Sequence, residues 1–168
     1  MGCETKEDTS NNDMAALTNY VGKWTAECVA TSITSTEPDI VHEIIVGSDG
    51  SYVHATRYYE DKCNDPTSLN YITYDAGTIT SIKKNEKNSE YDVLVIEPKL
   101  SSYTMKSRQQ VDDANNQKLC GLTNWTLNQI QLFDATSEKC FRAKASYTMK
   151  IADSELVYNG RGEFDGND

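Results

Sequence analysis

The sequence contains no run of about 18 apolar residues, the length that a membrane-spanning helix needs. Basic residues are scarce as well, because 16 Lys and Arg stand against 26 Asp and Glu, for a formal net charge of −10. Nucleic acids and anionic lipid headgroups are bound by clusters of Lys and Arg, so neither is an expected partner of this acidic chain. Its 168 residues are enough for one domain with a sizeable core.

Histidines and cysteine motifs of the kinds that catalyse reactions or bind metals are also few. No Cys-x-x-Cys pair occurs, which argues against a structural zinc or a thioredoxin-type site, and the only histidines are His42 and His54. They lie on opposite faces of a hairpin if its turn centres between Ser48 and Asp49, and on one face if the turn takes three residues. Without a His-paired Ser or a free reactive Cys, nucleophilic catalysis has no support. We therefore predict a protein that is not an enzyme and that uses no cofactor and no metal.

The five cysteines divide into Cys3, in a polar N-terminal region, and four in the region rich in strand-forming residues. An even set of four suggests two disulfides and an oxidising, extracytoplasmic compartment, whereas four buried free thiols would indicate a cytosolic protein. Of the three ways to pair the four, we predict Cys28–Cys63 and Cys120–Cys140. The first pair joins the first predicted strand to the turn after the third, and the second pair brackets a single strand.

The first 19 residues are polar and charged, a composition with too little apolar surface to offset the entropy of ordering. We therefore predict a flexible tether over residues 1–19, in which only 14–17 could form a helical turn. A β-domain over 20–160 and a disordered tail over 161–168 complete the predicted organisation.

The dipeptide Gly2-Cys3 is typical of the end of a bacterial lipobox. We predict that Cys3 carries a lipid and anchors the protein in the bacterial periplasm or at the cell surface, this anchor being its only membrane contact. N-myristoylation of Gly2 is an alternative, but Lys6 stands where Ser or Thr is expected. An incidental cysteine is the remaining interpretation.

Strand-forming residues dominate the rest of the chain, where ten tyrosines and frequent Thr and Ser suit a pleated surface better than a helix. Apolar and polar residues alternate most clearly over 141–151, Asp49-Gly50 is a hairpin signal, and Gly77 predicts a bulge. The predicted strands cover 24–33, 39–46, 51–60, 69–82, 91–96 (ended by Pro98), 100–110, 122–132, 141–151 and 156–158, with polar loops at 83–90 and 112–117. This pattern predicts an all-β, antiparallel, up-and-down barrel of about eight strands, with a two-sheet β-sandwich as the alternative.

Four motifs follow one another along the chain: Gly22-x-Trp24 with Cys28, Tyr58-Tyr59 with Asp61 and Cys63, Cys120-Gly121 with Trp125, and Asp153-x-x-Leu156-x-Tyr158-x-Gly160. In this combination the chain resembles a group of secreted or lipid-anchored bacterial domains that are similar to lipocalins. The resemblance covers Gly22 to Gly160. It implies a lipocalin-like, calycin-like barrel whose first tryptophan closes one end, and it implies no particular activity.

Side chains on the predicted strands supply the candidate site. The candidates for a ligand-lining surface are Tyr52, Tyr58, Tyr71, Tyr103, Tyr147 and Met149. Gly22, Trp24 and Trp125 are predicted to be structural, with Trp24 at the base of the barrel; in the alternative, Trp24 lines an open mouth and stacks on a ligand. A barrel of about eight strands can hold one small ligand or be filled by side chains. We therefore predict a non-enzymatic extracytoplasmic protein that binds a small apolar or amphipathic ligand, or else a surface module whose packed barrel presents loops to a protein or glycan.

Overall fold

The computed structural model describes residues 16–26, 28, 39–60, 63, 65–137, 139–141 and 145–161, the last four of these by their backbone alone. Short helical segments are few and strands predominate. The strands are β1 (Gly22–Thr25), β2 (Asp39–Val46), β3 (Ser51–Tyr59), β4 (Leu69–Lys84), β5 (Asp92–Met105), β6 (Ile130–Phe133), β7 (Ala145–Ala152) and β8 (Glu155–Arg161). The helical segments with assigned bounds are α2 (Arg108–Asn116) and two 3-10 turns, η1 (Pro66–Ser68) and η2 (Leu119–Gly121).

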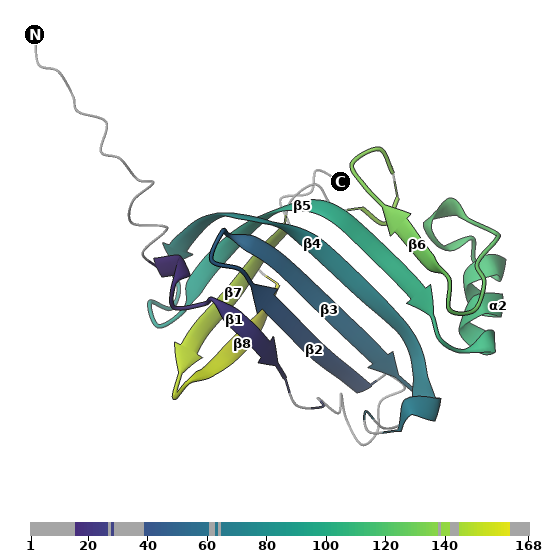
Figure 1. Cartoon of the computed structure of the whole chain (residues 1–168), viewed down its shortest axis with the longest axis horizontal. Coiled ribbons are helices and arrows are strands. Elements are labelled where there is room, and N and C mark those ends of the chain that lie inside the picture. Colours follow the sequence, from purple (N-terminus) through teal and green to yellow (C-terminus); the bar gives the residue numbers. More distant parts are fainter. Residues whose placement is uncertain are drawn as a thin grey trace, which may run out of the picture.

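All eight strands belong to one antiparallel sheet that curls into a nearly closed barrel (Figure 1). The strand order is β1-β2-β3-β4-β5-β7-β8, with β6 off this path and paired to β5. The long strand β5 therefore carries two partners along one edge, β7 beside Asp92–Ile96 and β6 beside Ser101–Thr104. This architecture confirms the predicted barrel rather than the sandwich. Strands β1 and β8 end the sheet, and no pairing joins them within the described chain.

The hairpin of β2 and β3 forms as its sequence predicts. Val46 pairs with Tyr52, and the intervening turn is held by the Asp49 carboxylate, which accepts a hydrogen bond from the Ser51 amide at 3.0 Å. Gly50 adopts a φ of +80°, a conformation that side chains other than glycine rarely adopt. The predicted bounds of β2 and the start of β3 are confirmed.

Strands β4 and β5 are long and bent at a bulge that requires glycine. The register shifts between Ala76 and Gly77, as predicted, and a Cβ at Gly77 would lie 2.4 Å from the Glu97 carbonyl oxygen. Pro98 pairs with Gly77 at this irregularity, where the missing amide of proline is tolerated. The prediction that Pro98 ends a strand was therefore wrong, because β5 continues through it to Met105.

The segment after β5 differs most from its prediction. Residues 108–116 form α2, not strand and polar loop, because the Ser107 side chain caps the helix by accepting a hydrogen bond from the Gln110 amide at 3.2 Å. The predicted strand over 122–132 shrinks to β6, which begins at Ile130. Backbone turns with positive φ at Lys118 and Cys120 precede it. The helix and these turns lie beside one end of the sheet (Figure 1).

The bounds of the first strand and of β7 also differ from their predictions. Strand β7 begins at Ala145 rather than at residue 141, and Phe141 instead packs against the cluster around Trp125. Strand β1 covers Gly22–Thr25, and the predicted continuation over 29–33 lies outside the described residues.

The interior is packed in two hydrophobic clusters. The first joins the N-terminal turn to the barrel strands, and its fully buried members are Leu17, Tyr20, Ile44, Val46, Tyr52, Ile82, Leu94, Ile96, Ala145, Tyr147 and Met149. The second, beneath α2, contains Met105, Ala114, Trp125 and Phe133, with Tyr71 and Tyr103 packed against it. The turn at 16–20 agrees with the helical turn expected near 14–17. Leu17 is only 3% exposed, so packing begins before residue 20.

Both predicted disulfides are present. Cys28 is bonded to Cys63 and Cys120 to Cys140, with Cα separations of 5.7 and 5.3 Å. Two disulfides indicate an oxidising, extracytoplasmic environment. Within the described segments, no helix has the length and apolar character needed to span a membrane.

Candidate functional site: the seam cleft and the histidine pair

A cleft of about 700 Å³ opens where the two ends of the sheet face each other. We call it the seam cleft. One wall comes from β1 and β2 and the other from the β7–β8 turn and β8. Its lining residues are Lys23, Trp24, Thr25, Ala26, His42, Ile44, Ser154, Glu155, Leu156 and Val157. Apolar side chains such as Ile44 and Leu156 alternate here with charged and polar ones, so the cleft is amphipathic.

Trp24 separates this cleft from the core. Its ring packs against the first hydrophobic cluster while also lining the cleft, and its indole N–H donates to the Tyr20 carbonyl oxygen at 2.8 Å. Gly22, two residues earlier, has a φ of +147°. A Cβ there would meet only the Trp24 ring, at an ordinary 3.7 Å, and not a neighbouring strand. The backbone conformation, rather than crowding from another strand, therefore accounts for glycine at this position.

The cleft reaches the interior of the barrel through two histidines. Ile44 pairs with His54 and His42 with Thr56, so all these side chains lie on one face of the hairpin. His42 Nδ1 lies 3.0 Å from His54 Nε2 and 3.3 Å from Thr56 Oγ1, and the latter two atoms are 3.4 Å apart. His42 lines the cleft, whereas His54 is buried at 2% exposure. The turn spacing left open by the sequence is thus settled in favour of one shared face.

Burial keeps both imidazoles neutral. It lowers the pKa of His54 to about 3, with the nearby His42 adding to the effect, and it lowers the pKa of His42 below its ordinary value. At neutral pH each ring therefore carries one proton, and one of the two facing nitrogens can donate to the other.

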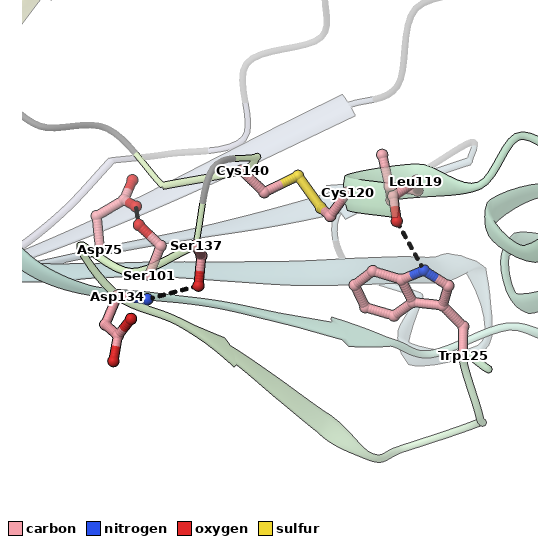
Figure 2. The surroundings of a disulfide bond; sticks show 8 residues. All are labelled: Asp75, Ser101, Leu119, Cys120, Trp125, Asp134, Ser137 and Cys140. Carbon is pink, nitrogen blue, oxygen red and sulfur yellow. Dashed lines mark hydrogen bonds between the residues drawn. A yellow bond between two sulfur atoms is a disulfide. The ribbon is translucent and has the colours of Figure 1, made fainter. Parts of the chain in front are cut away.

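Polar residues continue across the interior from the histidine pair. His54 pairs with Asp75 on β4, which pairs with Ser101 on β5, and the Ser101 hydroxyl donates to the Asp75 carboxylate at 2.7 Å (Figure 2). Ser101 is 2% exposed. A cavity of about 10 Å³ beside Asp75, lined also by Tyr52 and Tyr147, is large enough for about one water molecule.

The six candidate ligand-lining residues do not surround one cavity. Tyr52, Tyr147 and Met149 are fully buried in the first cluster, where the two tyrosine rings stack at 5.5 Å. Tyr58 and Tyr71 stack on each other with ring centroids 4.2 Å apart. Tyr103 contacts Trp125 in the second cluster.

Hydrogen bonds fix both the side chain and the backbone of Trp125, as expected for a structural residue. Its indole N–H donates to the Leu119 carbonyl at 3.2 Å, beside the Cys120–Cys140 disulfide (Figure 2). Its backbone exchanges two hydrogen bonds with the Asn115 side chain at 2.7 and 3.1 Å, which joins this loop to α2. Trp125 thus packs α2 and its loop onto one end of the barrel.

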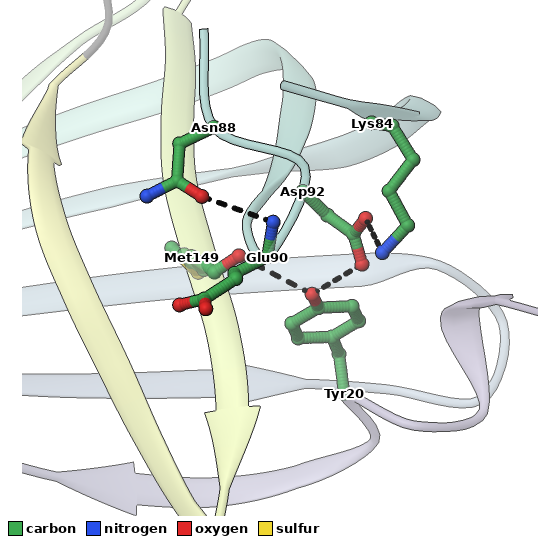
Figure 3. Close-up of polar contacts among 6 residues, drawn as sticks. All are labelled: Tyr20, Lys84, Asn88, Glu90, Asp92 and Met149. Atoms are coloured by element: carbon green, nitrogen blue, oxygen red, sulfur yellow. Dashed lines mark hydrogen bonds and ion pairs between the residues drawn. The ribbon is translucent and has the colours of Figure 1, made fainter. Parts of the chain in front are cut away.

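A second polar anchor fastens the N-terminal turn, at the far end of the sheet from α2 (Figure 1). The Tyr20 hydroxyl donates to Asp92 at 2.6 Å, and the other oxygen of Asp92 accepts from Lys84 at 2.7 Å (Figure 3). Burial and then Asp92 raise the pKa of Tyr20 well above its ordinary value. The role of Tyr20 was missed from the sequence, because its partner lies 72 residues away.

Comparison of the sequence with protein-family models and with curated proteins found no match. The fold and the site nevertheless place the protein in a structural class. It is an antiparallel, nearly closed β-barrel with two disulfides and an amphipathic cleft between its first and last strands.

Proposed function

We propose that this protein binds a small amphipathic molecule in the seam cleft. The observation that carries the proposal is the cleft itself, because about 700 Å³ lies in the range of small-molecule sites. Trp24, Ile44 and Leu156 offer apolar contact, while His42 and Lys23 offer polar groups that could orient a ligand. No enzymatic step is part of the proposal.

The ligand occupies the side of the barrel rather than its centre. The enclosed cavity next to Tyr52 measures only about 10 Å³, too small for anything beyond a single water. An amphipathic ligand in the cleft would place its apolar part against Trp24 and its polar part near His42 and the solvent.

Replacement of one alanine in the cleft and one elsewhere by tryptophan tests the site. Ala26 lines the cleft and is exposed, so Ala26→Trp fills the cleft without removing core packing. Ala135 is exposed in the turn after β6, so Ala135→Trp adds the same side chain elsewhere. The neutral fluorescent probe N-phenyl-1-naphthylamine should bind at least about tenfold more weakly to Ala26→Trp than to the parent or to Ala135→Trp. Equal binding by both variants would contradict the proposal.

The second candidate function, a surface interaction module, is favoured by the outer face of the sheet. Tyr74, Ser102 and Leu132 lie side by side on β4, β5 and β6, and Leu132 and Ile130 are each 61% exposed. Leu100 on β5 is exposed as well. Exposed apolar groups gathered on one sheet face are typical of surfaces that contact other proteins.

A second copy of the chain is the partner that can be tested directly. Sedimentation velocity should show self-association of the parent that weakens by about tenfold in Leu132→Lys. Thr80→Lys, at an exposed position on β4, is the matched control. A monomeric parent at all concentrations would exclude association through this face.

The location is proposed to be the bacterial cell envelope, with a lipid on Cys3 as the anchor. The support is the Gly2-Cys3 dipeptide ahead of a polar segment, together with the two disulfides of the barrel. Metabolic labelling with a palmitate analogue in a bacterial host, with a lipoprotein signal peptide fused ahead of Gly2-Cys3, should mark the parent and not Cys3→Ser. Equal labelling of the two would contradict lipidation at this residue.

A further inference from the structure

We propose that His42, His54 and Thr56 bind one transition-metal ion, with Cu²⁺ preferred to Zn²⁺, at the inner wall of the seam cleft. The site shares His42 with the proposed ligand cleft and adds His54 and Thr56, which are buried and are not among the residues that line the cleft. It departs from the expectation, drawn from the sequence, that no metal is bound.

The donor atoms are spaced as metal ligands are. His42 Nδ1, His54 Nε2 and Thr56 Oγ1 form a triangle with sides of 3.0, 3.3 and 3.4 Å. Ligand atoms on bonds of about 2.0–2.1 Å are about 2.9 Å apart at a right angle and about 3.3 Å apart at a tetrahedral angle. An ion at bonding distance from all three atoms would therefore sit just outside the plane of the triangle.

The facing nitrogens are the atoms that would bind. A metal takes the lone pair of a neutral imidazole, and His42 Nδ1 and His54 Nε2 are the two ring nitrogens that lie 3.0 Å apart. Binding selects the tautomer with the proton on Nε2 of His42 and on Nδ1 of His54, so the facing nitrogens both coordinate. No proton is lost from either ring, and a hydrogen bond between the rings is exchanged for two bonds to the ion.

The surroundings fix these ligands and leave room for a further one. His42 and Thr56 are direct cross-strand partners, and the His54 ring meets the edge of Tyr147 at 88° with centroids 5.5 Å apart. Sites carried on strands hold their geometry better than sites on loops. His42 borders the cleft, so water or a ligand group can occupy the open position.

The choice of metal follows from the ligand types. Two imidazoles and a hydroxyl form a nitrogen- and oxygen-rich set, for which Cu²⁺ has the highest affinity among the common divalent ions. The other cluster of donor groups within the described chain, Cys28, Asp39 and Cys63, has both sulfurs in a disulfide, so they are not thiolate ligands.

The test uses tag-free, metal-stripped protein with Cys3→Ser, which removes the one thiol outside the disulfides. Titration with Cu²⁺, followed by electron paramagnetic resonance, should show one ion per chain with hyperfine coupling to two imidazole nitrogens. His42→Ala should lower the Cu²⁺ affinity by at least about tenfold. Thr56→Val should weaken binding more than Thr73→Val, a control at the position that pairs with Thr56 on β4.

Two results would overturn the proposal. One is a parent spectrum with oxygen ligands alone, which would assign Cu²⁺ to surface carboxylates and leave the histidines as a hydrogen-bonded pair. The other is undiminished affinity in His42→Ala with its fold verified by circular dichroism. Because the naphthylamine probe is measured on metal-free protein, failure of the metal site and failure of the cleft as a ligand site are separate outcomes.

Discussion

At the scale of single residues, the histidine pair combines burial with proximity. Two imidazoles whose ring nitrogens lie 3.0 Å apart cannot both be protonated without strong repulsion. Desolvation of His54 acts in the same direction. The pair therefore links the stability of the barrel to pH.

We predict that metal-free protein loses stability on mild acidification. The pKa of His54 is about 3 when folded and about 6.5 when unfolded, so between these values the unfolded chain binds more protons. The free energy of unfolding should then decrease as the pH is lowered, by about 2 kcal/mol from pH 7 to pH 5 for this one group. Urea denaturation at several pH values measures the slope. His54→Gln should flatten it, and an unchanged slope in that variant would contradict the assignment.

Trp24 gives a second prediction at this scale. Because the ring packs against the core on one side and lines the cleft on the other, Trp24→Ala should cost about 3 kcal/mol of unfolding free energy, at the low end for tryptophan. Trp24→Phe keeps most of the packing and loses the hydrogen bond to Tyr20, which should cost about 1 kcal/mol. Urea denaturation with both disulfides intact gives both values. An Ala variant as stable as the parent would place Trp24 outside the core.

At the scale of elements, β7 shows a strand with two different faces. Met149 is fully buried, whereas the neighbouring Lys150 reaches Glu90 at 3.0 Å and lies over the Tyr91 ring. Of the residues predicted to alternate here, Ala145, Tyr147 and Met149 face the core as expected. Arg142 and Lys144 lie outside the described residues.

We expect Met149→Asp and Lys150→Asp to differ sharply. The first places a carboxylate in the apolar cluster without a partner and should cost several kcal/mol, about 4 or more. The second loses an exposed ion pair and adds repulsion with Glu90, a small effect. Thermal unfolding of the two variants provides the comparison, and similar losses would show that β7 is out of register.

Elements were predictable where local patterns act alone. The bounds of β2, the Asp49-Gly50 turn and the bulge at Gly77 follow from alternation and turn chemistry that lie within a few residues. The structure of the segment from Ser107 to Gln129 was not predictable in this way. Helix α2 has few apolar residues, and it is held through the hydrogen bonds of Asn115 with Trp125 and the packing of Ala114 in the second cluster. The effect of Pro98 was predicted wrongly, because the strand accommodates this proline only at the bulge formed with Gly77 on the neighbouring strand.

At the scale of the whole molecule, both ends of the barrel are covered by segments outside the main meander. The N-terminal turn adds Leu17 and Tyr20 to one cluster, and α2 with Trp125 covers the other. The candidate site could be predicted only in part. The sequence identified Trp24 and left open whether the two histidines share one face of their hairpin. It did not predict the cleft, because the cleft lies between β1 and β8 and no local pattern indicates a contact between segments so far apart.

Two truncations should separate the tether from the fold. Removal of residues 1–15 should leave the free energy of unfolding unchanged, because their composition is that of a linker. Removal through Tyr20 also deletes two buried apolar side chains and the contact with Asp92, and should cost about 4 kcal/mol. Urea denaturation of both proteins measures the difference. Equal stability of the two would show that the turn adds nothing to the barrel.

Within the described residues no backbone pairing joins β1 to β8, so hydrogen bonds do not fix the circumference of the barrel at this point. In a barrel closed by hydrogen bonds all round, strand number and shear fix the circumference. Here the two terminal strands can move apart while each keeps its one neighbour, β2 or β7. Separation of these two strands would widen the seam cleft that His42 borders, so under the proposed function the seam would be the route by which the ligand enters.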